Sequence, residues 1–168
     1  LIDYTGARDA QIFPRVEVRN HEGITLVMEH LVRLGHRRIA FITGLMAQQS
    51  AQERLEGYRD GLAAAGIAYD PTLVATGSWL PPENYTAAKA LFQLDPLPTA
   101  IVASCDFGAF ATYRVAQERG LVVGKDISIT GFDDIRSASL ADPPLTTIHQ
   151  PIYRLGQVAV EMLVKRLN

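Results

Sequence analysis

Two adjacent carboxylates, Asp133 and Asp134, stand where the chain leaves a stretch with the pattern of a buried strand. Residues 127–130 alternate β-branched and small side chains, and we expect Gly131 to end this strand. Ligands of open α/β sheets bind outside the carboxyl ends of the strands, where a carboxylate can accept hydrogen bonds from a polyol or from ring N–H groups. Asp and Pro, as in the run 142–151, are also favoured in turns, so turn formation and ligand contact both stay open.

Three earlier strand-to-helix connections carry polar, aromatic or nucleophilic side chains of a similar kind. The strand expected at 39–43 is followed by Gln48, Gln49, Ser50 and Arg54. The strand expected at 73–76 is followed by Trp79, and the strand expected at 100–103 is followed by Cys105 and Asp106. Because the carboxyl ends of parallel strands meet at one edge of a sheet, we expect these groups to lie near Asp133. An indole, a guanidinium and carboxylates suit a sugar, since the indole covers the apolar ring face and the charged groups bind hydroxyls.

Taken singly, several of these residues have simpler interpretations. Trp79 alone favours core packing, although its Ser-Trp-Leu-Pro-Pro context favours partial exposure. Arg54 alone fits a solvated helix residue, but we expect it in a first turn, where a cation opposes the helix dipole and needs a partner. Cys105 precedes an expected helix, so a thiol of lowered pKa and a small residue at a strand end both stay open.

The elements that must position these groups alternate between strand and helix. Strands are expected at 39–43, 73–76, 100–103, 127–130 and 146–148. Helices are expected at 22–34, 50–65, 81–92, 106–119 and after Pro151. The second is expected to begin with a capping box at Ser50 and Glu53, the third with Pro81 and Pro82, and the fourth with an N-cap at Asp106. This order predicts βαβ units, and therefore an α/β fold with a Rossmann-like parallel sheet and helices on both faces.

Composition bounds the function. The 168 residues, of which 48% are hydrophobic, suffice for one domain. The net charge of −2 argues against a nucleic-acid-binding surface within this segment. The single cysteine excludes an internal disulfide framework and suits a reducing cytoplasm. No run approaches the ~18 apolar residues of a membrane span. The start, Leu1-Ile2-Asp3, lacks Met and the features of a signal peptide, so we expect a piece of a longer protein.

Sequence signatures of catalysis and of cofactor binding are absent. We find no Gly-x-Ser-x-Gly elbow, no Gly-x-Gly-x-x-Gly after a strand, and no histidine pair with metal-ligand spacing. The run from Gly120 to Lys125 is one residue short of a phosphate loop and follows a helix. We therefore expect no catalytic residue, no metal and no cofactor.

Six runs of the sequence resemble a known family. They are Glu29-His30-Leu31, Leu34-Gly35-His36-Arg37-Arg38-Ile39-Ala40-Phe41-Ile42, Glu53-Arg54-Leu55-Glu56-Gly57-Tyr58, Pro98-Thr99-Ala100-Ile101, Asp126-Ile127-Ser128-Ile129-Thr130-Gly131-Phe132-Asp133-Asp134 and Pro144-Leu145-Thr146-Thr147-Ile148. In order and spacing they resemble the lactose/galactose repressor family over nearly the whole chain. The resemblance implies a periplasmic-binding-protein-like effector domain, in which two Rossmann-like lobes flank a cleft, in a cytoplasmic homodimer with an upstream helix-turn-helix.

The resemblance also implies how this segment is divided. Residues 1–19 would end the first lobe, 20–149 would form the second lobe, and 150–168 would cross back and pack a helix on the first. The apolar stripe of Ile152, Leu155 and Met162 would then lack its cover, so we expect the segment alone to aggregate or swap elements.

Carried over by position, the resemblance implies a set of ligand-binding residues. Arg54 and Asp133 match effector-contacting residues, Ser50, Trp79 and Gln150 match other lining positions, and Gln48 matches one more weakly. Cys105 stands where the family usually has Asn, which puts a hydrogen bond to the ligand in doubt there. Arg19-Asn20 replaces the common Asp-Asn, which would alter the hinge or the cleft rim.

The function expected from the sequence is therefore effector sensing, without catalysis, in a DNA-binding transcriptional regulator. The effector would be a mono- or disaccharide, and operator DNA would be bound through the helix-turn-helix. A secreted periplasmic sugar-binding protein of a transporter is the alternative with the same fold, and the loop 132–151 favours the regulator. An α/β enzyme is a third class, which turnover of a bound sugar would reveal.

Overall fold

A five-stranded parallel sheet forms the centre of residues 15–167, the part of the chain that the computed structural model describes. The strands are β1 (Ile39–Ile42), β2 (Val74–Ala75), β3 (Ala100–Ala103), β4 (Ser128–Asp133) and β5 (Thr146–His149). Their spatial order is β2-β1-β3-β4-β5, and every neighbouring pair is parallel. The expected Rossmann-like α/β fold is confirmed.

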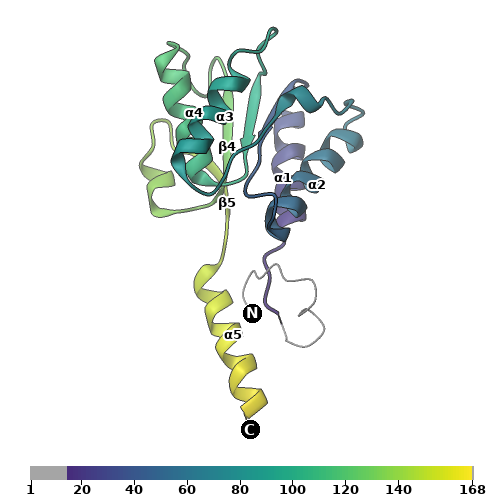
Figure 1. Ribbon diagram of the computed structural model, residues 1–168, viewed down its shortest axis with the longest axis vertical. Helices are drawn as coiled ribbons and strands as arrows, with labels where there is room; N and C mark the ends of the chain where they lie inside the picture. The colour runs from purple at the N-terminus through teal and green to yellow at the C-terminus, as the bar shows by residue number, and fades with distance from the viewer. Residues whose placement is uncertain (1–14, 168) are drawn as a thin grey trace.

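Helices cover both faces of this sheet (Figure 1). The helices are α1 (Asn20–Arg33), α2 (Gln49–Ala64), α3 (Pro81–Leu91), α4 (Asp106–Glu118) and α5 (Ile152–Leu167). Short 3-10 turns, Pro71–Leu73 and Arg136–Leu140, precede β2 and β5. Helices α1 and α2 lie on one side of the sheet, and α3 and α4 lie on the other.

Two apolar layers hold the helices to the sheet. Along β1, Ile39 and Phe41 face the layer under α1 and α2, whereas Ala40 and Ile42 face the layer under α3 and α4, and all four are fully buried. Strands of a parallel sheet are covered on both sides, which explains why β1 is a continuous apolar run. The buried Tyr58 of α2 also donates a hydrogen bond to the Ile39 carbonyl oxygen at 2.8 Å.

The start of α2 differs from the capping box expected at Ser50 and Glu53. The helix begins at Gln49, and its N-cap residue, Gln48, makes no capping hydrogen bond through its side chain. Glu53 instead accepts hydrogen bonds from Asn20 Nδ2 at 2.9 Å and from Gln49 Nε2 at 2.6 Å. The capping prediction is wrong because the Glu53 carboxylate joins α2 to α1. Arg54 consequently lies in the second turn of α2 and not in the first.

The N-cap of α4 is Cys105 and not Asp106. The Cys105 sulfur accepts a hydrogen bond from the Gly108 amide, whereas Asp106 is the first residue of the helix. The fully buried Asp106 carboxylate accepts hydrogen bonds from the Ile135 amide at 2.8 Å and from Thr147 Oγ1 at 2.6 Å. Asp106 therefore fixes the segments after β4 and within β5, which is why it does not cap its own helix.

Strand β4 continues through Gly131 and ends only at Asp133, so the prediction that Gly131 ends the strand is wrong. A Cβ atom at position 131 would lie 2.3 Å from Asp106 Oδ1. The glycine therefore permits the close approach of α4 to β4. Because the strand is longer than expected, Asp133 lies in the sheet and only Asp134 follows it.

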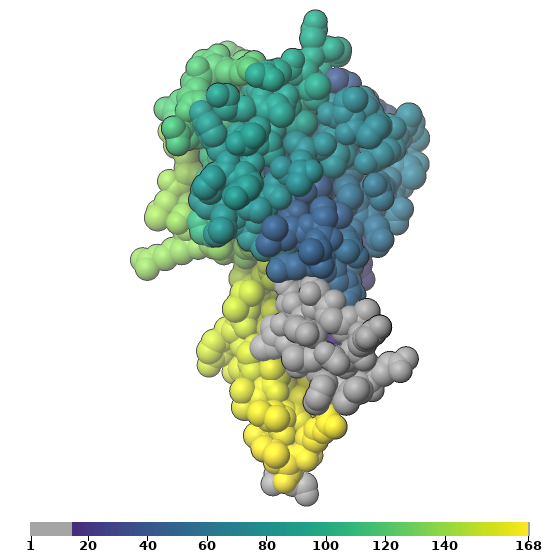
Figure 2. Space-filling view, in the orientation of Figure 1, coloured from purple at the N-terminus to yellow at the C-terminus, as the bar shows by residue number. Residues whose placement is uncertain are grey.

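Helix α5 projects away from the lobe formed by the sheet and helices α1 to α4 (Figure 1 and Figure 2). It contains no buried residue among those described, and Ile152, Tyr153 and Val160 are between 60% and 81% exposed. Of the expected uncovered stripe, only Ile152 is exposed, whereas Leu155 and Met162 are partly shielded. Residues 1–14, which make up most of the expected end of a first lobe, lie outside the described residues. No helix within 15–167 has the length and apolarity needed to cross a membrane.

Candidate functional site

A hollow of about 310 Å³ lies at the carboxyl edge of the sheet. It is lined by Gln48, Ser50, Arg54, Trp79, Cys105, Phe107, Asp133 and Gln150. The structure thus brings together around one hollow all seven residues expected from the sequence to bind a ligand, and it adds Phe107. Their role in ligand binding stays a prediction.

The guanidinium of Arg54 is held in place by two other parts of the fold. Its Nε donates to Asn20 Oδ1 at 2.9 Å, and its Nη1 donates to the carbonyl oxygen of Ser104. Arg54 is only 4% exposed, so the interpretation as a solvated helix residue is wrong. Asn20 is itself buried at the start of α1, where its side chain positions this guanidinium. The expected effect of Arg19 on a hinge or cleft rim stays a prediction.

Two aromatic rings and a carboxylate surround the same guanidinium. The Arg54 Cζ atom lies 3.8 Å from the centroid of the Phe132 ring and 5.3 Å from that of the Trp79 ring. Arg54 Nη1 is 3.8 Å from Asp133 Oδ1. Cation–π and ionic contacts of this kind are stronger when water is excluded, so the charge of Arg54 is balanced before any ligand arrives.

Asp133 is held in an unusual backbone conformation at the end of β4. Its φ is +128°, and Asp134 has a φ of +58°, values that L-residues rarely adopt. Gln150 holds it from the other side: the Gln150 side chain donates to Asp133 Oδ1, and the Gln150 amide donates to the Asp133 carbonyl oxygen at 3.2 Å. Burial raises the pKa of the Asp133 carboxyl, while Arg54 and the Gln150 hydrogen bond act in the opposite direction.

Trp79 closes the hollow on the side of the β2–α3 connection. Its Nε1 donates a hydrogen bond to Gln48 Oε1, and its ring is partly exposed. The ring packs directly on Gly44, where a Cβ atom would lie 2.1 Å from the indole. Of the two interpretations of Trp79, partial exposure is confirmed.

Cys105 contributes a buried, neutral thiol. Burial raises its pKa to about 11, so the hypothesis of a thiol with lowered pKa is wrong. Its sulfur donates to the Ser78 carbonyl oxygen at 3.8 Å and accepts from the Gly108 amide at 3.4 Å. With these two backbone contacts, Cys105 offers the hollow an apolar surface.

The other polar groups expected at this edge do not line the hollow. The Asp134 carboxylate pairs with His149 Nδ1 at 2.8 Å, and Gln49 donates to Glu53. Asp106 is buried behind the edge, in the hydrogen bonds described above. Asp133 is therefore the only carboxylate among the described residues that lines the hollow.

Two residues of this site were not assigned to it from the sequence. Phe107, in the first turn of α4, lines the hollow and is 46% exposed. Its place directly after the strand-end pair Cys105–Asp106 is a signal that could have identified it. Asn20 precedes Arg54 by 34 positions, and nothing in the sequence pattern links the two.

Residues 28–168 match the family of periplasmic binding protein-like domains. The chain is similar to the HTH-type transcriptional repressor PurR of Glaesserella parasuis, with 36% identity over 147 residues, which are 88% of this chain and 43% of the relative. It is equally similar to the HTH-type transcriptional regulator CelR of Thermobifida fusca, with 36% identity over 153 residues, 91% of this chain and 45% of the relative. The chain thus spans less than half the length of these relatives.

Solved structures show the same likeness. A complex of the transcriptional regulator CelR with cellobiose superimposes with a TM-score of 0.87 at 36% identity, over 90% of this chain and 46% of that protein. The Lac repressor bound to ONPG in its repressed state gives a TM-score of 0.87 at 33% identity, over 98% of this chain and 48% of that protein.

Proposed function

The chain belongs to the family of periplasmic binding protein-like domains, and we propose that it is the effector-sensing domain of a DNA-binding transcriptional regulator of the LacI family. The observation that carries this proposal is the convergence of Arg54, Trp79 and Asp133 on one hollow at the carboxyl edge of the sheet. The relatives PurR and CelR are transcriptional regulators, which favours this role over that of a secreted solute-binding protein.

The effector of this domain is a saccharide. The Trp79 indole offers a flat apolar surface for one face of a sugar ring, and Asp133, Ser50 and Gln48 offer groups that hydrogen-bond to hydroxyls. The charges of Arg54 and Asp133 balance one another, which favours a neutral ligand over an anion. The complex of CelR with cellobiose supports the same chemistry.

Binding without turnover is sufficient for this role, so no catalytic step is assigned to the hollow. A ligand that prefers one arrangement of two lobes shifts the population toward that arrangement. In a homodimer, this shift reaches the DNA-binding modules as a change in operator affinity. Such a regulator works in the cytoplasm.

The exposed apolar face of α5 fits a domain with a second lobe. Ile152, Val160 and Leu163 are each about 60% exposed on a helix that has no buried residue within 152–167. In our proposal, residues 20–149 form one lobe, and 150–168 cross back to a first lobe to which 1–19 belong. That lobe would bury the α5 face, since large exposed apolar patches indicate interaction sites.

Calorimetric titration of the full-length protein with a panel of mono- and disaccharides tests this proposal. We expect one saccharide to bind and to change the affinity of the protein for its operator, measured by fluorescence anisotropy of labelled DNA. Binding of a purine or nucleoside, with no response to any saccharide, would contradict the saccharide assignment. Conversion of a bound sugar to products would contradict the assignment as a pure sensor.

A further inference from the structure

The hollow has a polar side and an apolar side, which come from different elements. Arg54, Asp133 and Gln150, on α2, β4 and the segment after β5, form the polar side. Trp79 and the Cys105–Phe107 turn form the apolar side, on the β2–α3 and β3–α4 connections. Trp79 and Phe107 thus offer two aromatic rings to the same hollow, from two different segments.

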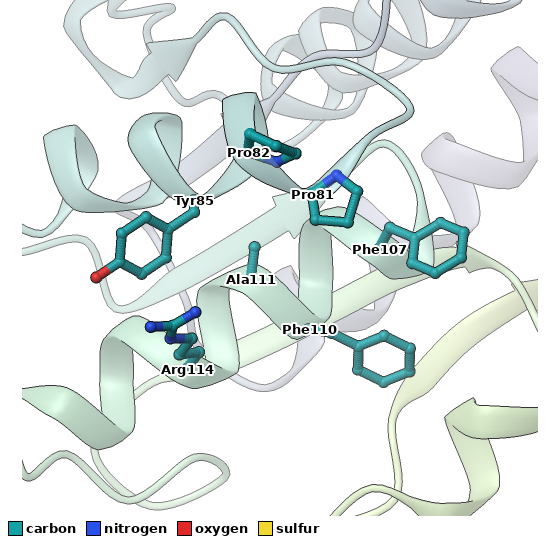
Figure 3. Close-up of a pocket in the computed structure, with 7 residues that line it drawn as sticks. All are labelled: Pro81, Pro82, Tyr85, Phe107, Phe110, Ala111 and Arg114. Carbon is teal, nitrogen blue, oxygen red and sulfur yellow. The ribbon is translucent and has the colours of Figure 1, made fainter.

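Phe107 occupies the boundary between this hollow and a second surface groove. The groove, of about 370 Å³, lies between α3 and α4 and is lined by Pro81, Pro82, Tyr85, Phe107, Phe110, Ala111 and Arg114. Figure 3 shows Phe107 at the end of this groove opposite Tyr85 and Arg114. The Phe107 ring therefore lies where the hollow and the groove meet, so a ligand longer than one sugar ring can extend over it.

The Phe107 ring has exposed aromatic surface at the hollow that is available to a ligand. Its side chain is 46% exposed, whereas Phe41, Phe92 and Phe132 are buried to within 1%. Covering an exposed aromatic ring with the apolar face of a sugar removes both from water, and ring stacking adds to that gain. The neighbouring Cys105 thiol is occupied by the backbone of Ser78 and Gly108, so this side selects by shape and apolar contact.

We propose that Phe107 is a second sugar platform and that the effector is a disaccharide, whose first ring lies against Trp79 and whose second ring covers Phe107. This inference rests on the proposed saccharide-sensing function and specifies the size of its ligand. Arg54 and Asp133 bind the first ring. Phe107 then discriminates between the disaccharide and its component monosaccharides.

The test is calorimetric titration of the full-length protein with cellobiose, maltose, lactose, trehalose and sucrose, each compared with glucose, galactose and fructose. We expect one disaccharide to bind about tenfold or more tightly than its component monosaccharides. Phe107→Ala lowers the affinity for that disaccharide by about three- to tenfold, the range of one stacking contact. The affinity for the monosaccharide changes by less than about twofold, because the first ring does not contact Phe107.

Phe110→Ala is the matched control, because Phe110 lies on the same helix and lines the groove but not the hollow. We expect it to leave the disaccharide affinity unchanged, and thermal melting verifies that each variant is folded. Phe107→Leu keeps the apolar bulk without the aromatic face, and it replaces Phe107→Ala if that variant does not fold.

The outcomes separate this inference from the proposed function. Monosaccharides that bind as tightly as disaccharides would overturn the inference alone. So would a Phe107 variant with unchanged disaccharide affinity, or a Phe110 variant that is equally impaired. If no saccharide binds the wild-type protein, the inference and the saccharide assignment fail together.

Discussion

The polar and apolar sides of the hollow differ in how firmly the fold holds them. On the polar side, Arg54 is 4% exposed and bonded to Asn20 and to the Ser104 carbonyl, and Asp133 is held by Gln150. On the apolar side, Phe107 is 46% exposed. The polar groups therefore keep their positions without a ligand, whereas the apolar side has surface left for a ligand to cover.

This difference follows from the elements involved. Arg54 and Asp133 lie on a helix and a strand of the core, while Trp79 lies on a connection and Phe107 in the first turn of a helix. Helices and strands of the core hold functional side chains in precise positions, whereas the sequence of a connection can change with little loss of core stability. We therefore expect recognition of a sugar ring to depend on the core elements that carry Arg54 and Asp133, and the choice among sugars to depend on the connection that carries Trp79 and the helix start that carries Phe107. The following predictions test this division.

Removing the guanidinium has the largest expected effect, because it disrupts the polar side and its support together. Arg54→Ala leaves the Asp133 carboxylate and Asn20 without their partner, and breaking a buried pair typically costs on the order of 3 kcal/mol in the free energy of unfolding. Chemical denaturation measures this loss. Arg59→Ala, at an exposed position of the same helix, serves as control and should change stability by less than about 0.5 kcal/mol. Equal effects of the two variants would contradict a preorganised polar side.

Adding one methyl group beneath the indole disrupts the apolar side. Gly44→Ala places a Cβ atom where the Trp79 ring lies, so the ring must move, at a cost of about 1–3 kcal/mol in stability. The loss should largely disappear in a Trp79→Ala background, because the clash is then absent. A double-mutant cycle of unfolding free energies measures this coupling, and additive effects would show that the indole does not rest on Gly44.

Neutralising Asp133 should separate binding from stability. Burial raises the pKa of this carboxyl, so the folded state holds the proton more tightly than the unfolded state. Stability from this group is therefore lost as pH rises from the ordinary carboxyl value through the raised one. Because the ionised carboxylate carries this cost of burial, Asp133→Asn should lower the free energy of unfolding at neutral pH by less than Arg54→Ala does. It should weaken effector binding by about 1.5 kcal/mol or more, as expected for a hydrogen bond to a charged group.

The pH dependence of binding checks the same residue. Wild-type affinity should fall as pH is lowered through the raised pKa of Asp133, whereas the affinity of Asp133→Asn should stay flat over that range. A parallel decline in both proteins would assign the pH dependence to a different group.

The smallest effects are expected at Cys105. Cys105→Ala removes the N-cap acceptor of α4 and should cost about 1 kcal/mol in the free energy of unfolding. Cys105→Ser keeps an acceptor for the Gly108 amide and should cost less. Because burial raises the pKa of this thiol to about 11, alkylation should stay slow up to moderately alkaline pH. Rapid alkylation at neutral pH would contradict the neutral thiol.

The hollow could largely be predicted because the carboxyl ends of parallel strands meet. Arg54, Trp79 and Asp133 each follow or end a different strand, so the order of strands and helices was sufficient to place them at one edge. The local details depended on contacts between segments far apart in sequence. Glu53 accepts a hydrogen bond from Asn20 and does not cap α2. Gly131 leaves room for the Asp106 side chain, and it lies inside a strand that the sequence pattern predicted to end at this residue.

The support behind the site could not be predicted for the same reason. Asn20 meets Arg54 across 34 positions, and the exposure of Phe107 is set by the packing of α4 against α3. Cysteine is also an uncommon N-cap residue, so the preference for Asp placed the start of α4 one residue late. Patterns of residue type predict elements and their order, but such tertiary contacts must be observed.

Fluorescence of Trp79 reports directly on ligand binding in the hollow, because this residue is the only tryptophan of the chain and lines the hollow. The full-length protein is titrated with saccharides under tryptophan-selective excitation, and a Trp79→Phe variant supplies the background. Our account predicts a saturable change for one saccharide that disappears in Trp79→Phe and is lost or strongly weakened in Asp133→Asn. A saccharide that binds by calorimetry without changing the Trp79 signal, or an unchanged titration in Asp133→Asn, would contradict it.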